Sequence, residues 1–238
     1  MTLRLRSGQV RRAVLSLLVL LCGLSLAWGQ VATPRVVAPK FVGGGGGSTA
    51  TWSLTNKNSD FVISNGGLTA TTTVLTGATS IGLGTTAVMT GQKRYYEETV
   101  NTVSSQASAG LANNTVSFSG GRWLGEGTNS VGYENNGNVY AGGSQIGTVG
   151  TFGNGAVISV AVDFAAGKVW FRLNGGNWNG SPTADPATNT GGLTHGVTGD
   201  LYPGYMLQYD GTTASQVTAN FGTAAFIYAV PSGFSTLP

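Results

Sequence analysis

The sequence predicts an all-β domain built as a sandwich or a barrel. Short apolar segments with alternating bulky side chains recur through residues 51–238, and Asn-Gly, Gly-Gly and Asp-Gly dipeptides separate them. No segment keeps the spacing of apolar residues that a helix requires for long enough to predict one. Many short strands with frequent turns and without helices are typical of sandwiches and barrels.

The clearest strand pair lies in residues 157–173. Bulky side chains fall on one parity from Ile158 to Phe164, and a second alternating run follows from Val169 to Leu173. Ala165-Ala166-Gly167 joins the two runs, so we expect a hairpin in which Gly167 takes a positive φ and Asp163 accepts a hydrogen bond from the turn. Further strands are expected at Leu68–Val74, Tyr95–Val103, Ser130–Tyr133, Tyr202–Leu207 and Gln216–Phe221.

Residues 1–29 are typical of a secretory signal peptide. Basic residues at Arg4, Arg6, Arg11 and Arg12 precede the apolar run Ala13–Leu26. Ala27 and Gly29 supply small residues before a cleavage point at Gln30. The run is short for a membrane span, so an uncleaved N-terminal anchor is the alternative. We therefore expect a secreted protein, periplasmic or extracellular, with no other membrane association.

Removing residues 1–29 changes the electrostatic character of the chain. Four of the 12 Lys and Arg residues and none of the nine Asp and Glu residues lie there, which leaves 8 − 9 = −1. No basic patch remains to suggest a nucleic acid partner. The single cysteine, Cys22, also lies in this segment, so the remaining chain has no disulfide or thiol nucleophile and depends on a buried core.

Residues 30–50 are predicted to form a Pro/Gly-rich N-terminal arm and linker. Pro34 and Pro39 stand among valines and alanines, and Gly43–Gly47 follow, in which the backbone has the most freedom to lose on ordering. No second boundary is visible after this linker, so residues 51–238 are expected to form one domain.

A series of motifs between Trp52 and the end of the chain has a recognisable order and spacing. They are Tyr95-Tyr96-Glu97, Leu124-Gly125, Val131-Gly132-Tyr133, residues 157–176, residues 201–211, Asn220-Phe221-Gly222 and Phe226-Ile227-Tyr228. Together they resemble the SPRY domain family, and residues 51–73 and 177–200 resemble its bacterial and phage form. The resemblance implies a bent, antiparallel two-sheet β-sandwich of the concanavalin-like jelly-roll type. It also implies a non-catalytic role in binding proteins through loops at one end, and it assigns no contact residue.

The side chains that catalysis needs are scarce. Glu97 and Glu98 are the only adjacent carboxylates, but successive strand residues face opposite sides, so they cannot converge on one substrate. We expect Glu97 to be structural and Glu98 to face solvent. His195 is the only histidine, lies in a Gly-flanked loop and has no Gly-x-Ser-x-Gly partner, so we expect a solvated loop residue. No catalytic residue is predicted.

Cofactor sites are equally poorly supported. One histidine and no cysteine after residue 29 exclude the usual zinc ligand sets. Asn56, Asn58 and Asp60 alternate as calcium ligands do, so a calcium ion in this loop is the alternative, although the closing glutamate of an EF-hand is missing. Gly43–Gly47 lack the Lys-Ser/Thr of a phosphate-binding loop. We therefore expect no cofactor or metal. Asn113-Asn114-Thr115 fits a glycosylation acceptor if the source is a eukaryote.

Aromatic residues near turns are the remaining candidates for ligand contacts, because a flat ring with a polar edge can anchor a protein side chain or stack on a sugar. Tyr133, Trp170 and Phe171 are expected to pack in the core instead. Trp178, in an Asn-Trp-Asn-Gly loop, is the first candidate. The others are Trp123, Arg122 beside it, Tyr140 and Tyr209.

The function predicted is that of a secreted, non-catalytic module that recognises a protein partner through loops at one end of a β-sandwich. One alternative is a lectin-like carbohydrate-binding protein, which the architecture and the turn aromatics favour. A second is a structural subunit of an extracellular fibre or phage particle, in which residues 30–42 pair with the sheet edge of another copy.

Overall fold

The computed structural model describes residues 47–73, 79–86, 91–118 and 123–238. Contacts within the chain separate residues 1–43 from residues 44–238, and the fold described below belongs to the second unit. In the part of the chain that is described, no helix has both the length and the apolar character needed to cross a membrane.

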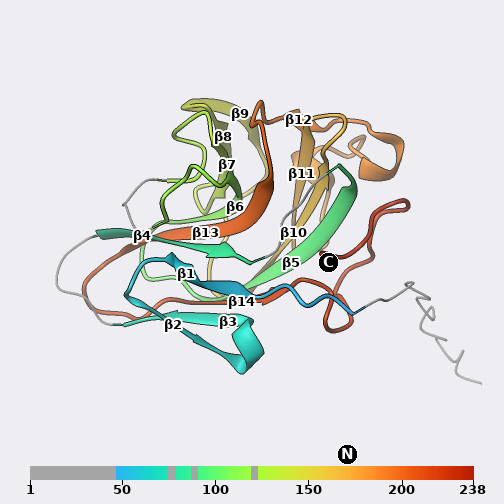
Figure 1. Cartoon of the computed structure of the whole chain (residues 1–238). Coiled ribbons are helices and arrows are strands. Elements are labelled where there is room, and N and C mark those ends of the chain that lie inside the picture. The colour runs from blue at the N-terminus through green and yellow to red at the C-terminus, as the bar shows by residue number, and fades with distance from the viewer. Residues whose placement is uncertain (1–46, 74–78, 87–90, 119–122) are drawn as a thin grey trace, which may run out of the picture. The chain divides into compact units, whose positions relative to one another are not determined.

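Two seven-stranded antiparallel sheets make up the domain (Figure 1). The first contains, in spatial order, β1 (Trp52–Lys57), β4 (Thr79–Thr85), β13 (Leu201–Tyr209), β6 (Ala107–Asn113), β7 (Ser130–Glu134), β8 (Asn138–Ala141) and β9 (Ser144–Thr148). The second contains β12 (Leu193–Thr194), β11 (Lys168–Leu173), β10 (Ala156–Asp163), β5 (Lys93–Thr102), β14 (Gln216–Asn220), β3 (Thr69–Thr72) and β2 (Phe61–Ser64). The only helical segments described are the 3-10 turns η1 (Asn65–Gly67), η2 (Trp178–Gly180) and η3 (Pro186–Thr188). The predicted all-β two-sheet fold is confirmed.

The predicted hairpin is the β10–β11 pair. Val160 lies opposite Phe171 in an antiparallel register, and Gly167 has a φ of 61°. The Asp163 carboxylate accepts a hydrogen bond of 3.1 Å from the backbone N–H of Ala166, as the turn chemistry required. The other expected strands correspond to β3, β5, β7, β13 and β14, although Val74 lies outside the described residues.

The main core lies between the two sheets, because each contributes large apolar side chains to one cluster. Tyr96, Val160 and Phe171 come from the second sheet, while Leu111 and Tyr133 come from the first, and all are fully buried. Aromatic rings of Tyr133 and Phe171 meet with their centroids 5.6 Å apart across the two sheets. The packing roles predicted for Tyr133, Trp170 and Phe171 are therefore confirmed.

The outer face of the second sheet is also covered, which the alternation in the sequence did not reveal. Every residue of β10 is buried. Tyr95, Ala161 and Trp170 form a second apolar cluster on this face, against which Phe226 and Phe234 of the C-terminal segment pack. Residues 223–238 thus act as a cover over β5, β10 and β11, so these strands are buried on both sides.

The expectation that Glu98 faces solvent is wrong. Glu98 is fully buried and lies on the same side of β5 as Tyr96 and Val100, which belong to the core between the sheets. Glu97 faces the other side, where the C-terminal segment lies, and is also buried. The prediction that the two carboxyl groups point to opposite faces is confirmed. The error lay in the assumption that one of these two faces of β5 is exposed to solvent.

Candidate functional site

Four connections meet at one end of the sandwich. They are the β6–β7 loop (residues 114–129), the β8–β9 turn (142–143), the β10–β11 turn (164–167) and the β12–β13 loop (195–200). β6 ends at Asn113, opposite Leu201 at the start of β13, and Lys168 pairs with Thr194 of β12. Because strand ends bring loops together in this way, we refer to this region as the loop end.

Backbone hydrogen bonds tie the connections of the loop end to one another. The β8–β9 turn donates from Gly143 to the carbonyl of Gly125 at 2.7 Å and from Gly142 to that of Gly127 at 3.2 Å. The β12–β13 loop donates from His195 to the carbonyl of Gly167 at 3.2 Å. These bonds satisfy backbone groups that would otherwise depend on water, so they limit the conformations of the loops.

Asn113 fixes the β6–β7 loop to the β12–β13 loop. Its side-chain amide donates to the Thr198 carbonyl at 3.1 Å and to the Asn129 side chain at 3.3 Å. Its side-chain oxygen accepts from the backbone N–H and the hydroxyl of Thr115 at 3.0 and 2.6 Å. Asn113 is buried in these contacts, so its amide is not exposed to glycosylation once the domain has folded.

The described residues of the β6–β7 loop, 114–118 and 123–129, pack on the outer face of the first sheet. Phe118 and Leu124 are buried there against Ala112 and Met206. The ring of Phe118 fits over Gly84 of β4, where a Cβ atom would lie only 2.9 Å from it. Two buried apolar anchors stabilise the loop by several kcal/mol at ~1.5–3 kcal/mol per large side chain. The residues between these anchors and β7 are thereby held against the sheet.

Gly125 brings the loop next to Tyr140 of β8. It has a φ of 92°, and a Cβ atom at this position would collide with the Tyr140 carbonyl oxygen. Only glycine meets both requirements without strain. The consequence is that Trp123 and Tyr140, which are 17 positions apart in the sequence, both border the same short stretch of loop.

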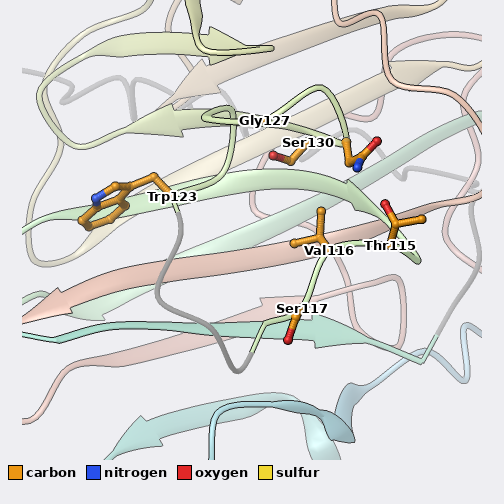
Figure 2. Close-up of a pocket in the computed structure, with 7 residues that line it drawn as sticks. Thr115, Val116, Ser117, Trp123, Gly127 and Ser130 are labelled. Carbon is orange, nitrogen blue, oxygen red and sulfur yellow. The ribbon is translucent and has the colours of Figure 1, made fainter.

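A hollow of about 280 Å³ opens beside this stretch (Figure 2). Figure 2 shows Trp123 on one side, Thr115, Val116 and Ser117 on the other, and Gly127 and Ser130 between them. Trp123 is half-buried, with part of its ring packed on the Phe118 cluster. Since none of the described residues that line the hollow is charged, an apolar or neutral polar group suits this part of it.

A second, more open hollow of about 230 Å³ lies on the other side of the β6–β7 loop. It is formed where β9 and β12, terminal strands of the two sheets, come together (Figure 1). The residues that line it are Thr128, Ala141, Gly142, Ile146, Thr194, His195 and Gly196. Thr128 belongs to the same loop as Gly127 and Asn129 of the first hollow, so the loop separates two recesses.

The expectation that His195 is a solvated loop residue is wrong. Its side chain is only 6% exposed, because the β12–β13 loop folds back toward the β10–β11 turn. The Nδ1 atom accepts a 3.0 Å hydrogen bond from the backbone N–H of Val197. Loss of hydration lowers the pKa of His195 below its ordinary value, so the imidazole is neutral at neutral pH.

Trp178, the first contact candidate, lies away from both hollows. It starts η2 and is 9% exposed. The guanidinium of Arg172 lies 4.3 Å from the centre of its ring, and Tyr95 meets it edge-on at 6.4 Å. These contacts favour a packing role, and the binding role stays a prediction. Arg122 lies outside the described residues, and Tyr209 lies in β13 with its side chain undescribed.

The calcium alternative finds little support around Asn56, Asn58 and Asp60. The Asn58 side chain already accepts a 2.9 Å hydrogen bond from the backbone N–H of Asp60. The Lys57 ammonium donates to the Phe61 carbonyl at 2.8 Å, which places a positive charge at this turn. Among the residues that the structure describes, no group of three or more His, Cys, Asp or Glu side chains could hold a metal ion.

Sequence reasoning missed the roles of Asn113, Gly125 and His195. Asn113 followed by Thr115 reads equally well as a turn in which the side chain accepts from a backbone N–H two residues later. Gly125 stood in a family-like motif, but its contact with Tyr140 depends on how the loop crosses the sheet. No local signal marks His195 as buried, because its neighbours Thr194 and Gly196 are typical of exposed loops.

In a comparison with models of protein families, the SPRY domain model matches residues 93–223, which is more than half of this chain. The chain therefore belongs to the SPRY domain family, whose members are protein-interaction modules and are generally non-catalytic. The match includes β5 to β14 and therefore all four connections of the loop end. A search of curated proteins finds no match.

Solved structures confirm the fold at low sequence identity. The SPRY domain of human HERC1 is 17% identical with a TM-score of 0.54, and the match covers 71% of this chain and 96% of that one. The PSpry domain of TRIM65 is 13% identical with a TM-score of 0.52, covering 72% and 91%. Stonustoxin is 16% identical with a TM-score of 0.52, covering 72% of this chain and 27% of the toxin.

Proposed function

We propose that this protein is a secreted, non-catalytic module that recognises a protein partner through the loop end. The observation that carries the proposal is the hollow beside the half-buried Trp123, on a loop whose anchors are fully packed. Membership in a family of protein-interaction modules supports the class of function. The hollow beside Trp123 supports the position that we propose for the contact surface.

The anchoring of Phe118 and of residues 124–127 in the β6–β7 loop favours binding. A loop that must be ordered by its partner loses conformational freedom on binding, and this loss weakens the affinity. Here the loop is already held by Phe118 and Leu124 in the apolar cluster, and by the bonds from Gly142 and Gly143. A partner therefore meets Trp123 in a preorganised position, with a large aromatic surface of the kind that dominates binding energies.

The test uses the full chain as exported by its host, immobilised and screened against a displayed library of random peptides. Peptides that bind are then measured against Trp123→Ala and against Leu54→Ala, which changes a 72% exposed side chain on β1, at the opposite edge of the first sheet from β9. We expect Trp123→Ala to weaken binding at least ~10-fold, about 1.4 kcal/mol, and Leu54→Ala to leave it unchanged. Peptides that bind both variants as tightly as the unchanged protein would contradict the proposal.

A glycan array with the same protein tests the lectin-like alternative. Specific glycan binding that is lost in Trp123→Ala or Trp178→Ala, together with no peptide selected, favours a carbohydrate ligand. The fibre alternative depends on residues 30–42, which lie outside the described residues. A monomeric mass in light scattering that is unchanged by deleting residues 30–47 argues against assembly through this arm.

Secretion is tested by the mass and the N-terminal sequence of the protein recovered from its host. We expect the mature chain to begin at Gln30 and to appear outside the cytoplasm. Recovery of the intact chain in the membrane fraction supports an uncleaved anchor instead. A bacterial or phage source is part of the same proposal and is decided by the organism that encodes the gene.

A further inference from the structure

His195, one of the residues that line the second hollow, carries a buried hydrogen-bond donor whose role the fold leaves open. Because Nδ1 of His195 accepts from the N–H of Val197, the neutral ring carries its proton on Nε2. Nε2 is buried and has no hydrogen-bond partner among the described residues. A buried donor without a partner is costly, which makes this atom a candidate for a ligand contact.

The hollow around His195 offers room on its open side. Gly142 and Gly196 line it, and a Cβ atom built on either would meet nothing within 4 Å. Thr128, Thr194 and the apolar Ile146 are also among the residues that line it. The described residues that line the hollow thus bring together one histidine, two threonines and apolar surface, and they include no Lys, Arg, Asp or Glu.

We propose that this hollow binds the carbonyl oxygen of an amide group and that the Nε2–H of His195 donates the hydrogen bond to it. The inference rests on the proposed function, because a protein partner supplies the amide from an Asn or Gln side chain or from its backbone. His195 then donates a hydrogen bond to one polar group of the partner, while Trp123, across the β6–β7 loop, contacts an apolar group of the same partner.

The lining favours an amide over an ionic group. A carboxylate loses strong hydration on entering a recess and needs a positive partner in return. The imidazole is neutral, and the Lys168 ammonium group donates to the Thr194 hydroxyl at 2.8 Å. Lys168 itself is not among the described residues that line the hollow. A cationic group would meet an N–H donor instead of an acceptor. An amide carbonyl accepts from a neutral donor without these costs.

The experiment is an NMR titration of the isotopically labelled full chain with three small probes. Acetamide represents the side-chain amide, N-methylacetamide the backbone amide, and acetate the anion at matched ionic strength. His195 is the only histidine, so its ring resonances are unambiguous. We expect saturable shifts at the His195 ring and at the amides of residues 142 and 194–197, with a dissociation constant on the order of tens of millimolar for an amide probe.

Two substitutions distinguish loss of the Nε2 donor from a change in the structure of the loop. The side-chain oxygen of Asn can replace Nδ1, so His195→Asn keeps an acceptor for Val197 and lacks the Nε2 donor. The side-chain nitrogen of Gln can replace Nε2, so His195→Gln keeps a donor. We expect His195→Asn to lose the amide-induced shifts and His195→Gln to retain part of them, with the remaining spectrum of both variants unchanged outside the loop end.

Two results overturn the inference. One is that acetate shifts the His195 resonances as much as the amides do. The other is that neither amide gives a saturable shift at concentrations up to about 0.5 M. Failure of the inference is distinct from failure of the proposed function. Peptides whose binding depends on Trp123 but not on His195 leave the proposed function standing and remove this inference. Amide binding at His195 without any peptide ligand supports the hollow and contradicts the wider role of the loop end.

Discussion

Glu97 and Glu98 are neighbours on β5 that lie in two different buried environments. The Glu97 carboxyl group accepts hydrogen bonds from the backbone N–H groups of Ile227 and Tyr228 at 2.8 and 2.9 Å, and from the Tyr95 hydroxyl at 2.6 Å. The Glu98 carboxyl group has no hydrogen-bond partner among the described residues and is fully buried. Two identical side chains therefore contribute to stability in opposite ways.

Glu98→Gln is expected to stabilise the domain at alkaline pH. Burial raises the pKa of Glu98 well above its ordinary value, so the folded state holds a proton that the unfolded chain releases above about pH 4.3. The free energy of unfolding of the unchanged protein should therefore fall as pH rises, by up to about 1.4 kcal/mol per pH unit from this group, until the raised pKa is passed. Denaturant unfolding at pH 5 and pH 8 measures the effect. A variant whose stability falls with pH as steeply as that of the unchanged protein would show that Glu98 is not the source.

Glu97→Gln is the matched substitution and should act in the opposite direction. A Gln amide cannot accept at both positions, so it leaves an N–H of Ile227 or Tyr228, or the Tyr95 hydroxyl, without an acceptor. We expect a loss of about 1–3 kcal/mol and faster hydrogen exchange in residues 226–230. Exchange that is equally fast across the whole domain would instead indicate global destabilisation without release of the C-terminal cover.

Phe118 and Trp123 should separate folding from binding within one loop. Phe118 is fully buried on Gly84 and the Met206 cluster, so Phe118→Ala should cost about 3–5 kcal/mol in the free energy of unfolding. Trp123 is only partly buried and lines the hollow, and Trp123→Ala should cost no more than about 1–2 kcal/mol while reducing peptide binding. Equal losses of stability in the two variants would mean that Trp123 is a second anchor and not a contact residue.

Gly125→Ala is expected to disturb the loop end. The left-handed backbone at φ 92° and the close Tyr140 carbonyl both exclude a Cβ atom, so the loop has to move. We expect a loss of about 1–3 kcal/mol and amide shifts at Gly143, whose N–H donates to the Gly125 carbonyl. Gly127→Ala is the control, because its Cβ atom meets nothing within 4 Å.

His195 should titrate at a lower pH than a histidine in a short peptide. Burial lowers its pKa, so the folded domain binds a proton less readily than the unfolded chain does. This contribution to stability is constant above about pH 6.5 and falls as pH decreases below it. NMR of the ring should show the Nε2-protonated tautomer unchanged from pH 8 to about pH 6.5. Titration at or above the peptide value would contradict the burial of the ring.

Much of the fold could be predicted because its causes are local. Alternation from Ile158 to Leu173 and the glycine at 167 are sufficient for the hairpin, since side chains in a strand have a period of two and a tight turn needs positive φ. The opposite orientations of Glu97 and Glu98 follow from the same period. The candidate site was predicted less completely, because Trp123 and Tyr140 were named but the hollows beside the loop were not.

The sequence by itself determined which residues share a face of each strand, where the chain turns, and that reactive side chains are few. Only the tertiary structure decided which strand faces are buried, since burial depends on segments distant in the sequence that pack against each strand. The C-terminal segment covers Trp178 and Glu97, the opposite sheet covers Glu98, and the β12–β13 loop encloses His195. Exposure is a property of these distant contacts, so no local pattern around the four residues could have given it.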